Sequence, residues 1–200
     1  MSYKEHYTSS MISNIESPIS SAQNGLLILD RDGTLIENIP YLKDKELIKF
    51  RNGVFDGLLK AQENKFDLVV ATNQSGVARN LVRVEDVNSI HEEMTQQLLN
   101  HGIVLNQYIF CPHHPDDNCT CRKPNNSMIE EIIRVKRIDR EKIFLIGDSV
   151  TDVLAANKSK IKSILIEDNE SIKLALLDDV SKAKNFESAI NLVFSEPVFY

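Results

Sequence analysis

The chain has 200 residues, of which 42% are hydrophobic and 26% charged, and it carries a formal net charge of −6. This length fits one domain with a substantial buried core, and the composition is that of an ordinary soluble protein. The acidic balance argues against broad nucleic-acid binding, and no apolar stretch is long enough to span a bilayer. We therefore expect neither a nucleic acid nor a membrane as a partner.

The first 24 residues are rich in Ser, Asn and Gln and lack the basic and apolar segments of a secretory signal. They predict a polar, loosely ordered extension over residues 1–24, followed by one domain over residues 25–200. The missing signal pattern favours a cytoplasmic location.

Apolar runs alternate with helical patterns along the rest of the chain. We expect strands over Leu26–Leu29, Phe66–Ala71, Gln107–Phe110, Ile143–Ile146 and Ser163–Ile166. We expect helices near Phe55–Asn64, Val84–His101, Met128–Ile138, Asp152–Lys158 and Ser181–Phe194, the last one stopped by Pro197. This alternation predicts an α/β fold with a Rossmann-like parallel sheet, covered by helices on both faces, that collects functional loops along one edge.

Two carboxylates follow the first apolar run, in the segment Leu29-Asp30-Arg31-Asp32-Gly33-Thr34-Leu35. In an extended chain, residues i and i+2 face the same side, so Asp30 and Asp32 can reach one reacting group. Gly33 then lets the backbone turn away. Taken alone, an Asp-x-Asp pair after a strand is more often a solvated surface turn than a catalytic pair.

Three further segments supply a hydroxyl, a cation and another carboxylate: Ala71-Thr72-Asn73-Gln74-Ser75-Gly76, Cys121-Arg122-Lys123-Pro124 and Ile146-Gly147-Asp148-Ser149-Val150-Thr151-Asp152. Together the four segments predict one phosphoryl-transfer site. Their order resembles the motifs of the haloacid dehalogenase (HAD) superfamily of phosphatases. The resemblance covers roughly residues 26–168, and within the superfamily it points to the small heptose bisphosphate phosphatases and the related histidinol-phosphate phosphatases.

The resemblance implies a phosphoric monoester hydrolase with Asp30 as nucleophile and Asp32 as general acid/base. Thr72 and Lys123 then face the oxygens of the transferred phosphoryl group. A catalytic Mg²⁺ is also implied, held by Asp30, Asp148 and the backbone carbonyl of Asp32.

The implied reaction releases the 7-phosphate of D-glycero-D-manno-heptose 1,7-bisphosphate through an aspartyl-phosphate, in the biosynthesis of nucleotide-activated heptose for lipopolysaccharide. Histidinol phosphate is the alternative substrate, and an inactive phosphosugar-binding protein is a second alternative. About forty residues separate Asp32 from Thr72, so we expect no large cap domain, an open site and a monomer. The expected substrate contacts are Asn38, Tyr41, Thr72, Asn73, Gln74, Ser75 and Arg122.

All three cysteines lie in the segment Cys111-Pro112-His113-His114-Pro115-Asp116-Asp117-Asn118-Cys119-Thr120-Cys121, and an odd number would leave one unpaired in a disulfide framework. Three thiolates and an imidazole instead indicate a closed, structural Zn²⁺ site that braces the loop leading into Lys123. The residues alone do not distinguish His113 from His114. The family pattern selects His113, so the expected ligands are Cys111, His113, Cys119 and Cys121. Reduced cysteines packed in an ordinary loop are the alternative.

Overall fold

The computed structural model describes residues 23–167 and 180–195. Within these ranges, six parallel strands form one sheet in the order β3-β2-β1-β4-β5-β6. The strands are β1 (Gly25–Leu29), β2 (Phe66–Asn73), β3 (Gln107–Cys111), β4 (Ile143–Gly147), β5 (Lys162–Ile166) and β6 (Ser181–Ala183).

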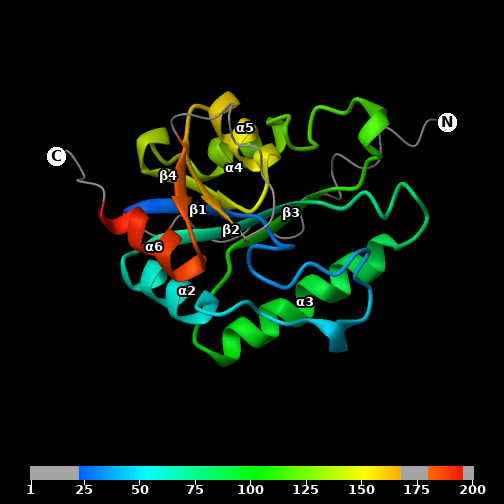
Figure 1. Cartoon of the computed structure of the whole chain (residues 1–200), viewed down its shortest axis with the longest axis horizontal. Helices are drawn as coiled ribbons and strands as arrows, with labels where there is room; N and C mark the ends of the chain where they lie inside the picture. Colours follow the sequence, from blue (N-terminus) through cyan, green and yellow to red (C-terminus); the bar gives the residue numbers. More distant parts are fainter. Residues whose placement is uncertain (1–22, 168–179, 196–200) are drawn as a thin grey trace.

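Helices cover both faces of this sheet (Figure 1). One face carries α4 (Ser127–Lys136) and α5 (Val150–Lys158), and the other carries α2 (Val54–Glu63), α3 (Val84–Asn100) and α6 (Phe186–Ser195). Short 3-10 turns η1, η2 and η3 lie at Lys45–Leu47, Pro115–Asp117 and Arg140–Lys142.

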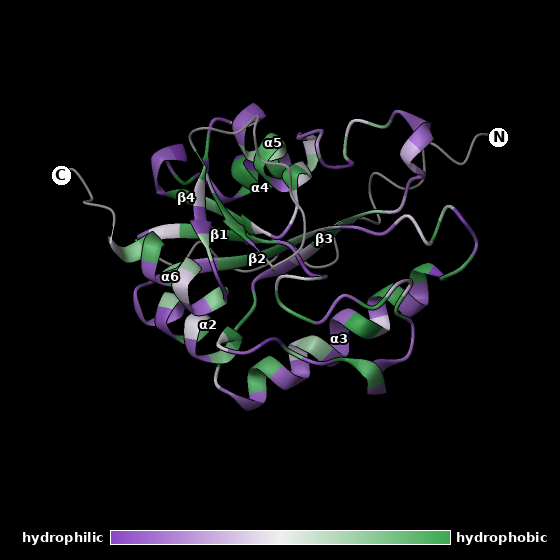
Figure 2. Ribbon diagram, viewed as in Figure 1, coloured by the Kyte–Doolittle hydropathy of each residue, from purple (hydrophilic) through white to green (hydrophobic). Residues whose placement is uncertain are grey.

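Two large hydrophobic cores lie between the sheet and its helices, and a third, small cluster joins β3 to the start of α3. Leu27 and Leu29 of β1 belong to the core under α2, α3 and α6, whereas Leu26 and Ile28 belong to the core under α4 and α5. Side chains of one strand alternate between the faces, so a strand with helices on both sides must be apolar throughout. Figure 2 shows this contrast between the apolar strands and the mixed, outward-facing helices.

The predicted α/β fold with a parallel sheet is confirmed, and each predicted strand lies within the bounds of an observed one. The predicted helix over Ser181–Phe194 is wrong in its first part. Residues Ser181–Ala183 form β6, which pairs with β5, and the helix begins only at Phe186. There the Asn185 side chain accepts a hydrogen bond from the Ser188 N–H, which starts the helix. Pro197 lies outside the described residues.

The order of the strands in the sheet determines where a ligand can bind. The chain runs outward from β1 to β2 and β3, then returns to β4 on the other side of β1 and continues to β5 and β6. Such a reversal opens a crevice at the carboxyl ends of the two central strands, which is where ligands bind in open α/β sheets. Among the described residues, no separate domain is inserted over this edge.

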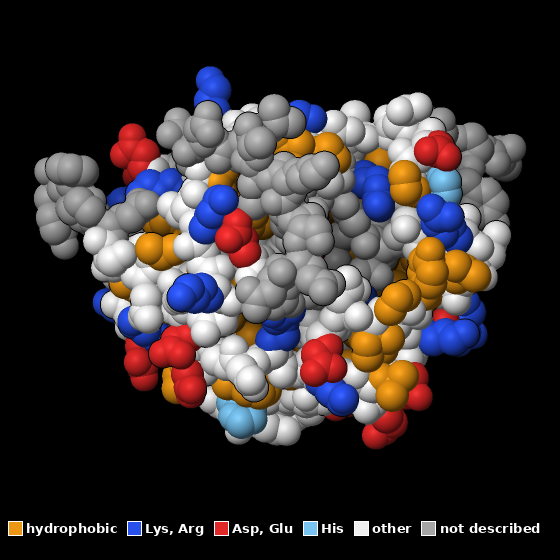
Figure 3. Space-filling view, in the orientation of Figure 1, with side chains coloured by type: hydrophobic (Ala, Val, Ile, Leu, Met, Phe, Trp, Pro, Cys, Tyr) orange, Lys and Arg blue, Asp and Glu red, His pale blue; other side chains and the backbone are white. Residues whose placement is uncertain are grey.

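Acidic and basic side chains are interspersed among the described residues on the face shown in Figure 3. In the part of the chain that the structure describes, no helix is both long and apolar enough to cross a membrane. The predicted extension over residues 1–24 falls almost wholly outside this part, and the domain boundary therefore stays a prediction.

Candidate active site

Polar side chains meet at the carboxyl edge of the sheet because three neighbouring strands end there. Asp30 directly follows β1, Thr72 lies near the end of β2, and Asp148 directly follows β4. The backbone N–H of Asp30 donates to the carbonyl of Ile146 at 2.9 Å, which continues the β1–β4 pairing to the site. Parallel pairing thus brings together residues from the first, second and fourth predicted segments.

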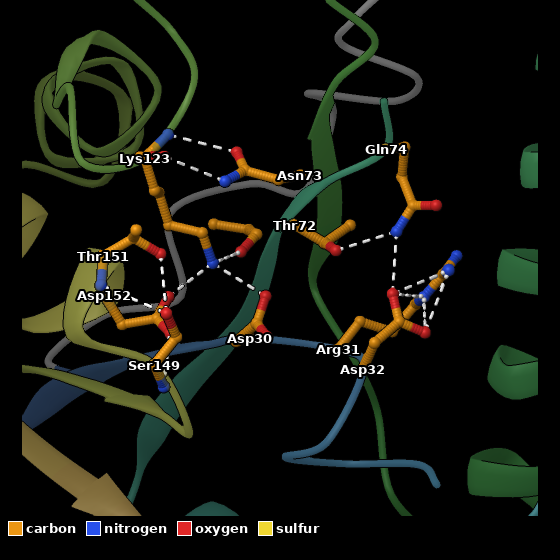
Figure 4. Close-up of polar contacts among 11 residues, drawn as sticks. Asp30, Arg31, Asp32, Thr72, Asn73, Gln74, Lys123, Ser149, Thr151 and Asp152 are labelled. Carbon is orange, nitrogen blue, oxygen red and sulfur yellow. Dashed lines mark hydrogen bonds and ion pairs between the residues drawn. The ribbon is translucent and has the colours of Figure 1, made fainter. Parts of the chain in front are cut away.

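Lys123 lies at the centre of the site (Figure 4). Its Nζ donates to Asp30 Oδ1 at 2.7 Å and to the backbone carbonyl of Ala71 at 2.7 Å. The same ammonium pairs with Asp152 Oδ1 at 2.6 Å. All three charged side chains are buried, so the lysine has a fixed position between two carboxylates. A fixed cation beside Asp30 can meet the oxygens of a phosphoryl group that Asp30 attacks.

Burial and like charge raise the pKa values of the carboxyl groups. Burial raises the pKa of Asp30 to about 7, although Lys123 opposes this rise. Burial and the Asp152 carboxylate raise the pKa of Asp148 to about 6. Burial also lowers the pKa of Lys123, but Asp152 and Asp30 raise it more, so the net shift is upward. The cluster therefore holds more negative charge than Lys123 alone offsets.

Asp30, Asp148 and Asp152 each place a carboxylate oxygen within 4.8 Å of the others. Asp148 fits against the turn after β1 because Gly33 has no side chain: a Cβ there would lie 1.9 Å from Asp148 Oδ2. Hard, oxygen-only donor sets with a surplus of negative charge suit Mg²⁺. The donor chemistry thus fits the predicted ion, with Asp152 as a neighbour of the predicted ligands Asp30 and Asp148.

Asp152 also starts α5. Its Oδ2 accepts a hydrogen bond from the Ser149 N–H at 3.2 Å, and Ser149 Oγ accepts one from the Thr151 N–H at 3.1 Å. The first bond belongs to a capping box, in which the Ser149 side chain also accepts from the Asp152 backbone N–H. The other oxygen of Asp152 remains for Lys123, so one residue ties the helix start to the site.

Asp32 is held by its neighbours in sequence and space. The Arg31 Nε and Nη2 atoms lie 2.9–3.2 Å from its two carboxylate oxygens. The Gln74 Nε2 donates to Asp32 Oδ2 at 2.8 Å and to Thr72 Oγ1 at 2.9 Å. Gln74 therefore links the predicted acid/base to the predicted hydroxyl (Figure 4).

The predicted substrate contacts fall into two groups. Asn73 is engaged within the protein, since its amide donates to the Lys123 carbonyl at 3.0 Å and accepts from the Lys123 N–H at 3.1 Å. This exchange positions Lys123. Asn38 and Tyr41 are exposed, and the Tyr41 ring packs over Gly76 in the loop that carries the half-buried Ser75.

Arg122 precedes Lys123 and is half-buried. Its Nη1 is buried without a hydrogen-bond partner among the described residues. A buried guanidinium N–H without an acceptor lowers the stability of the protein, so this nitrogen is suited to donate to an anionic group.

The cysteine segment converges as the sequence predicts. Cys111, His113, Cys119 and Cys121 place their ligand atoms within 4.8 Å of one another. The three sulfur atoms are 3.2–3.6 Å apart, and His113 Nδ1 lies 3.2 Å from Cys121 Sγ. These separations are close to the edge of a tetrahedron with Zn–S bonds of ~2.3 Å. His114 instead accepts the Asp116 N–H on its own Nδ1.

Sequence reasoning missed two residues near the site, Arg31 and His91. The Arg31 side chain is 1% exposed, and its Nη1 lies 3.2 Å from His91 Nε2. The available signal was weak: His91 follows Val87 and Ile90 on the apolar side of a predicted helix, where a buried histidine is usually a packing residue. Only the fold shows that this histidine faces the loop after β1.

Comparisons with known proteins agree with this geometry. Residues 120–190 match a family model described as HAD-hydrolase-like. A D-glycero-beta-D-manno-heptose-1,7-bisphosphate 7-phosphatase from Helicobacter pylori (strain J99) is 34% identical over 75% of this chain and 87% of its own length. The histidine biosynthesis bifunctional protein HisB from Legionella pneumophila is 30% identical over 84% of this chain, which spans about half of that protein.

Solved structures of heptose bisphosphate phosphatases are also similar to this chain. The D,D-heptose 1.7-bisphosphate phosphatase from B. bronchiseptica, complexed with magnesium and phosphate, matches 86% of this chain and 99% of its own at a TM-score of 0.79 and 30% identity. The corresponding phosphatase from Burkholderia thailandensis has a TM-score of 0.64 at 21% identity over 85% of this chain and 99% of its own, which supports the fold.

Proposed function

This chain belongs to the HAD-superfamily phosphatases, and from that premise we propose that it removes the 7-phosphate of D-glycero-D-manno-heptose 1,7-bisphosphate. The observation that carries the chemistry is the buried Asp30 carboxylate, held 2.7 Å from the Lys123 ammonium at the carboxyl edge of the sheet. Two relatives named 7-phosphatases, at 34% and 32% identity, support the substrate.

In the first step, an Asp30 oxygen attacks the phosphorus atom in line with the sugar oxygen. The new Asp30–phosphorus bond forms as the bond to the sugar oxygen breaks, and Asp32 gives that oxygen a proton. Lys123 and the Thr72 hydroxyl face the charge that develops on the phosphoryl oxygens.

In the second step, water attacks the phosphorus atom of the aspartyl-phosphate. Asp32, now a carboxylate, takes a proton from this water as the bond to Asp30 breaks, which releases phosphate and restores both aspartates. Gln74 keeps Asp32 beside Thr72 through both steps, because its amide contacts both side chains.

Mg²⁺ is the proposed cofactor of this site. When bound, it supplies positive charge that offsets the carboxylate and phosphoryl oxygens. Asp30, Asp148 and the backbone carbonyl of Asp32 would hold it. The raised pKa values of Asp30 and Asp148, caused by burial and by like charge, support a site that takes up a cation.

A structural Zn²⁺ is proposed for the cysteine segment, with Cys111, His113, Cys119 and Cys121 as ligands. Three sulfur donors and one nitrogen at tetrahedral spacing support it. The segment ends one residue before Arg122, so an ordered loop would fix where Arg122 and Lys123 enter the site.

The second phosphate of the substrate would bind Arg122. The buried, unpartnered Nη1 of this side chain supports the assignment, since a guanidinium can bind a phosphate through two nitrogens. Asn38, Tyr41 and Ser75, on adjoining loops, are the proposed sugar contacts. We further propose a monomeric, cytoplasmic enzyme in nucleotide-heptose synthesis, with its domain over residues 25–200.

Histidinol phosphate is the second candidate substrate, because the HisB relative aligns over 84% of this chain. The test measures phosphate release with Mg²⁺ from both esters, compared as kcat/KM. We expect a preference for the bisphosphate of at least about 100-fold, lost in Arg122→Met because only the bisphosphate carries a second phosphate. A preference for histidinol phosphate would overturn the heptose assignment. No release above that of Asp30→Asn would instead indicate a protein that only binds phosphosugars.

A further inference from the structure

Arg31 is a buried charge that requires partners on all sides. It lies between Asp30 and Asp32 in sequence, directly after β1, and its side chain is 1% exposed. The Nε and Nη2 atoms donate hydrogen bonds to both oxygens of Asp32 (Figure 4). Burying a guanidinium is costly unless its remaining donors also find acceptors. The atom left over by the Asp32 contact is Nη1.

His91 provides the acceptor for this atom, with Nε2 at 3.2 Å from Arg31 Nη1. Because arginine can only donate, His91 Nε2 must accept, which places the ring proton on Nδ1. Burial and the Arg31 charge hold the pKa of His91 well below its usual value, which favours this neutral form.

Two elements fix the imidazole. His91 is 6% exposed on α3, and its ring stacks on Tyr108 of β3 with 4.2 Å between ring centroids and an interplanar angle of 10°. A rigid helix and a rigid strand therefore determine where the Nε2 atom lies. A chain of contacts runs from these elements through Arg31 to the carboxyl group of Asp32.

We propose that His91 is a positioning residue for Asp32: it holds Arg31, and Arg31 together with Gln74 fixes the orientation of the Asp32 carboxyl group. The inference rests on the proposed function, since it requires Asp32 to act as acid and base. Gln74 donates to Oδ2, so Oδ1 carries fewer donors and is the oxygen that passes the proton to the departing sugar oxygen.

The test compares two esters that differ in their need for a proton. A sugar or alkyl oxygen departs only as it is protonated, whereas p-nitrophenolate departs as a stable anion. For an enzyme that forms a phosphoryl intermediate, kcat/KM covers the steps through leaving-group departure. Misplacing the acid therefore lowers kcat/KM for the better of the two natural esters, heptose bisphosphate or histidinol phosphate, far more than for p-nitrophenyl phosphate.

We expect His91→Leu, which removes the acceptor, to lower kcat/KM about 10–100-fold on the natural ester. The loss on p-nitrophenyl phosphate should stay within about threefold. His91→Gln restores an acceptor of similar reach and should recover most of the loss. Tyr108→Leu removes the stacked ring but keeps the acceptor, so it should change the ratio of the two rates less than His91→Leu does. If His91→Leu does not fold, His91→Asn replaces it. The asparagine side chain is too short to bring its acceptor to Arg31, and this variant is then compared with His91→Gln.

Equal losses of kcat/KM on the natural ester and on p-nitrophenyl phosphate in His91→Leu, or no recovery of kcat/KM in His91→Gln, would overturn the inference. The proposed function would still stand, because the wild-type protein would be active on its natural ester. If the wild-type protein turns over neither natural ester, both the proposed function and the inference are overturned.

Discussion

Gly33 occupies a position where any side chain would displace a carboxylate of the site. Its φ is +80°, a conformation that other residues rarely adopt, and a Cβ there would lie 1.9 Å from Asp148 Oδ2. Backbone conformation and space therefore both require glycine. The contact also explains how a carboxylate after β4 can lie beside one after β1.

A matched pair of substitutions separates these two requirements. Gly102 also has a positive φ, +75°, but a Cβ there would meet nothing within 4 Å. Gly33→Ala and Gly102→Ala should each cost about 1 kcal/mol of unfolding free energy from backbone strain. Only Gly33→Ala should also lower kcat, by about 100-fold, because it moves Asp148. Thermal unfolding and phosphate release measure the two effects. Equal activities in the two variants would contradict this role for Gly33.

The sequence could predict which residue types carry the chemistry, but not all of their neighbours. Asp30, Asp32 and Lys123 stand in ordered motifs, so their types and spacing indicate a phosphoryl-transfer site. The role of His91 depends on a contact across 60 positions of sequence. Its place on an apolar helix face gives no hint of this partner, since burial in a core explains the same pattern.

The segment between β3 and α4 is the element that most directly supports Lys123. It begins with Cys111 at the end of β3 and continues past Cys121 into Lys123. Asn125 donates to the Cys119 carbonyl at 2.8 Å, and Asn73 exchanges two hydrogen bonds with the Lys123 backbone. An ordered cysteine cluster therefore stabilises the position of the Lys123 ammonium through a few hydrogen bonds to the backbone.

Removal of the proposed Zn²⁺ should loosen this segment without removing the nucleophile. We expect the chelated protein to unfold ~5–10 °C lower, since a few kcal/mol shift the Tm of a chain this long by that amount. Phosphate release should fall about tenfold, as for other changes that only support a site. Differential scanning calorimetry and steady-state rates measure both. Adding Zn²⁺, but not Mg²⁺ alone, should restore them. Unchanged stability and activity after chelation would contradict the zinc assignment.

Secondary structure was predictable where an element carries its own pattern. The apolar runs of β1 and β4 match strands that are buried throughout, because both faces are covered. β6 has only three residues, and its strand form depends on pairing with β5. Pairing between strands leaves no pattern in the local sequence, so the sequence predicts a helix over these three residues instead.

For the whole molecule, strand order turns separate motifs into one site. The first and last motifs are more than 100 residues apart in sequence, yet β1 and β4 are neighbours. Alternating strands and helices predict that such loops gather at one edge. They do not predict that Lys123 lies between Asp30 and Asp152, because that position depends on how the cysteine segment folds back over the sheet.

In the proposed reaction, Asp30 attacks phosphorus and forms an acyl phosphate. The most direct measurement quenches the protein in acid during turnover of substrate labelled with radioactive phosphate, then isolates the labelled peptide. We expect a label on the peptide that carries Asp30, released by hydroxylamine as an acyl phosphate should be and absent from Asp30→Asn. Full turnover by Asp30→Asn, or a label on another residue, would contradict it.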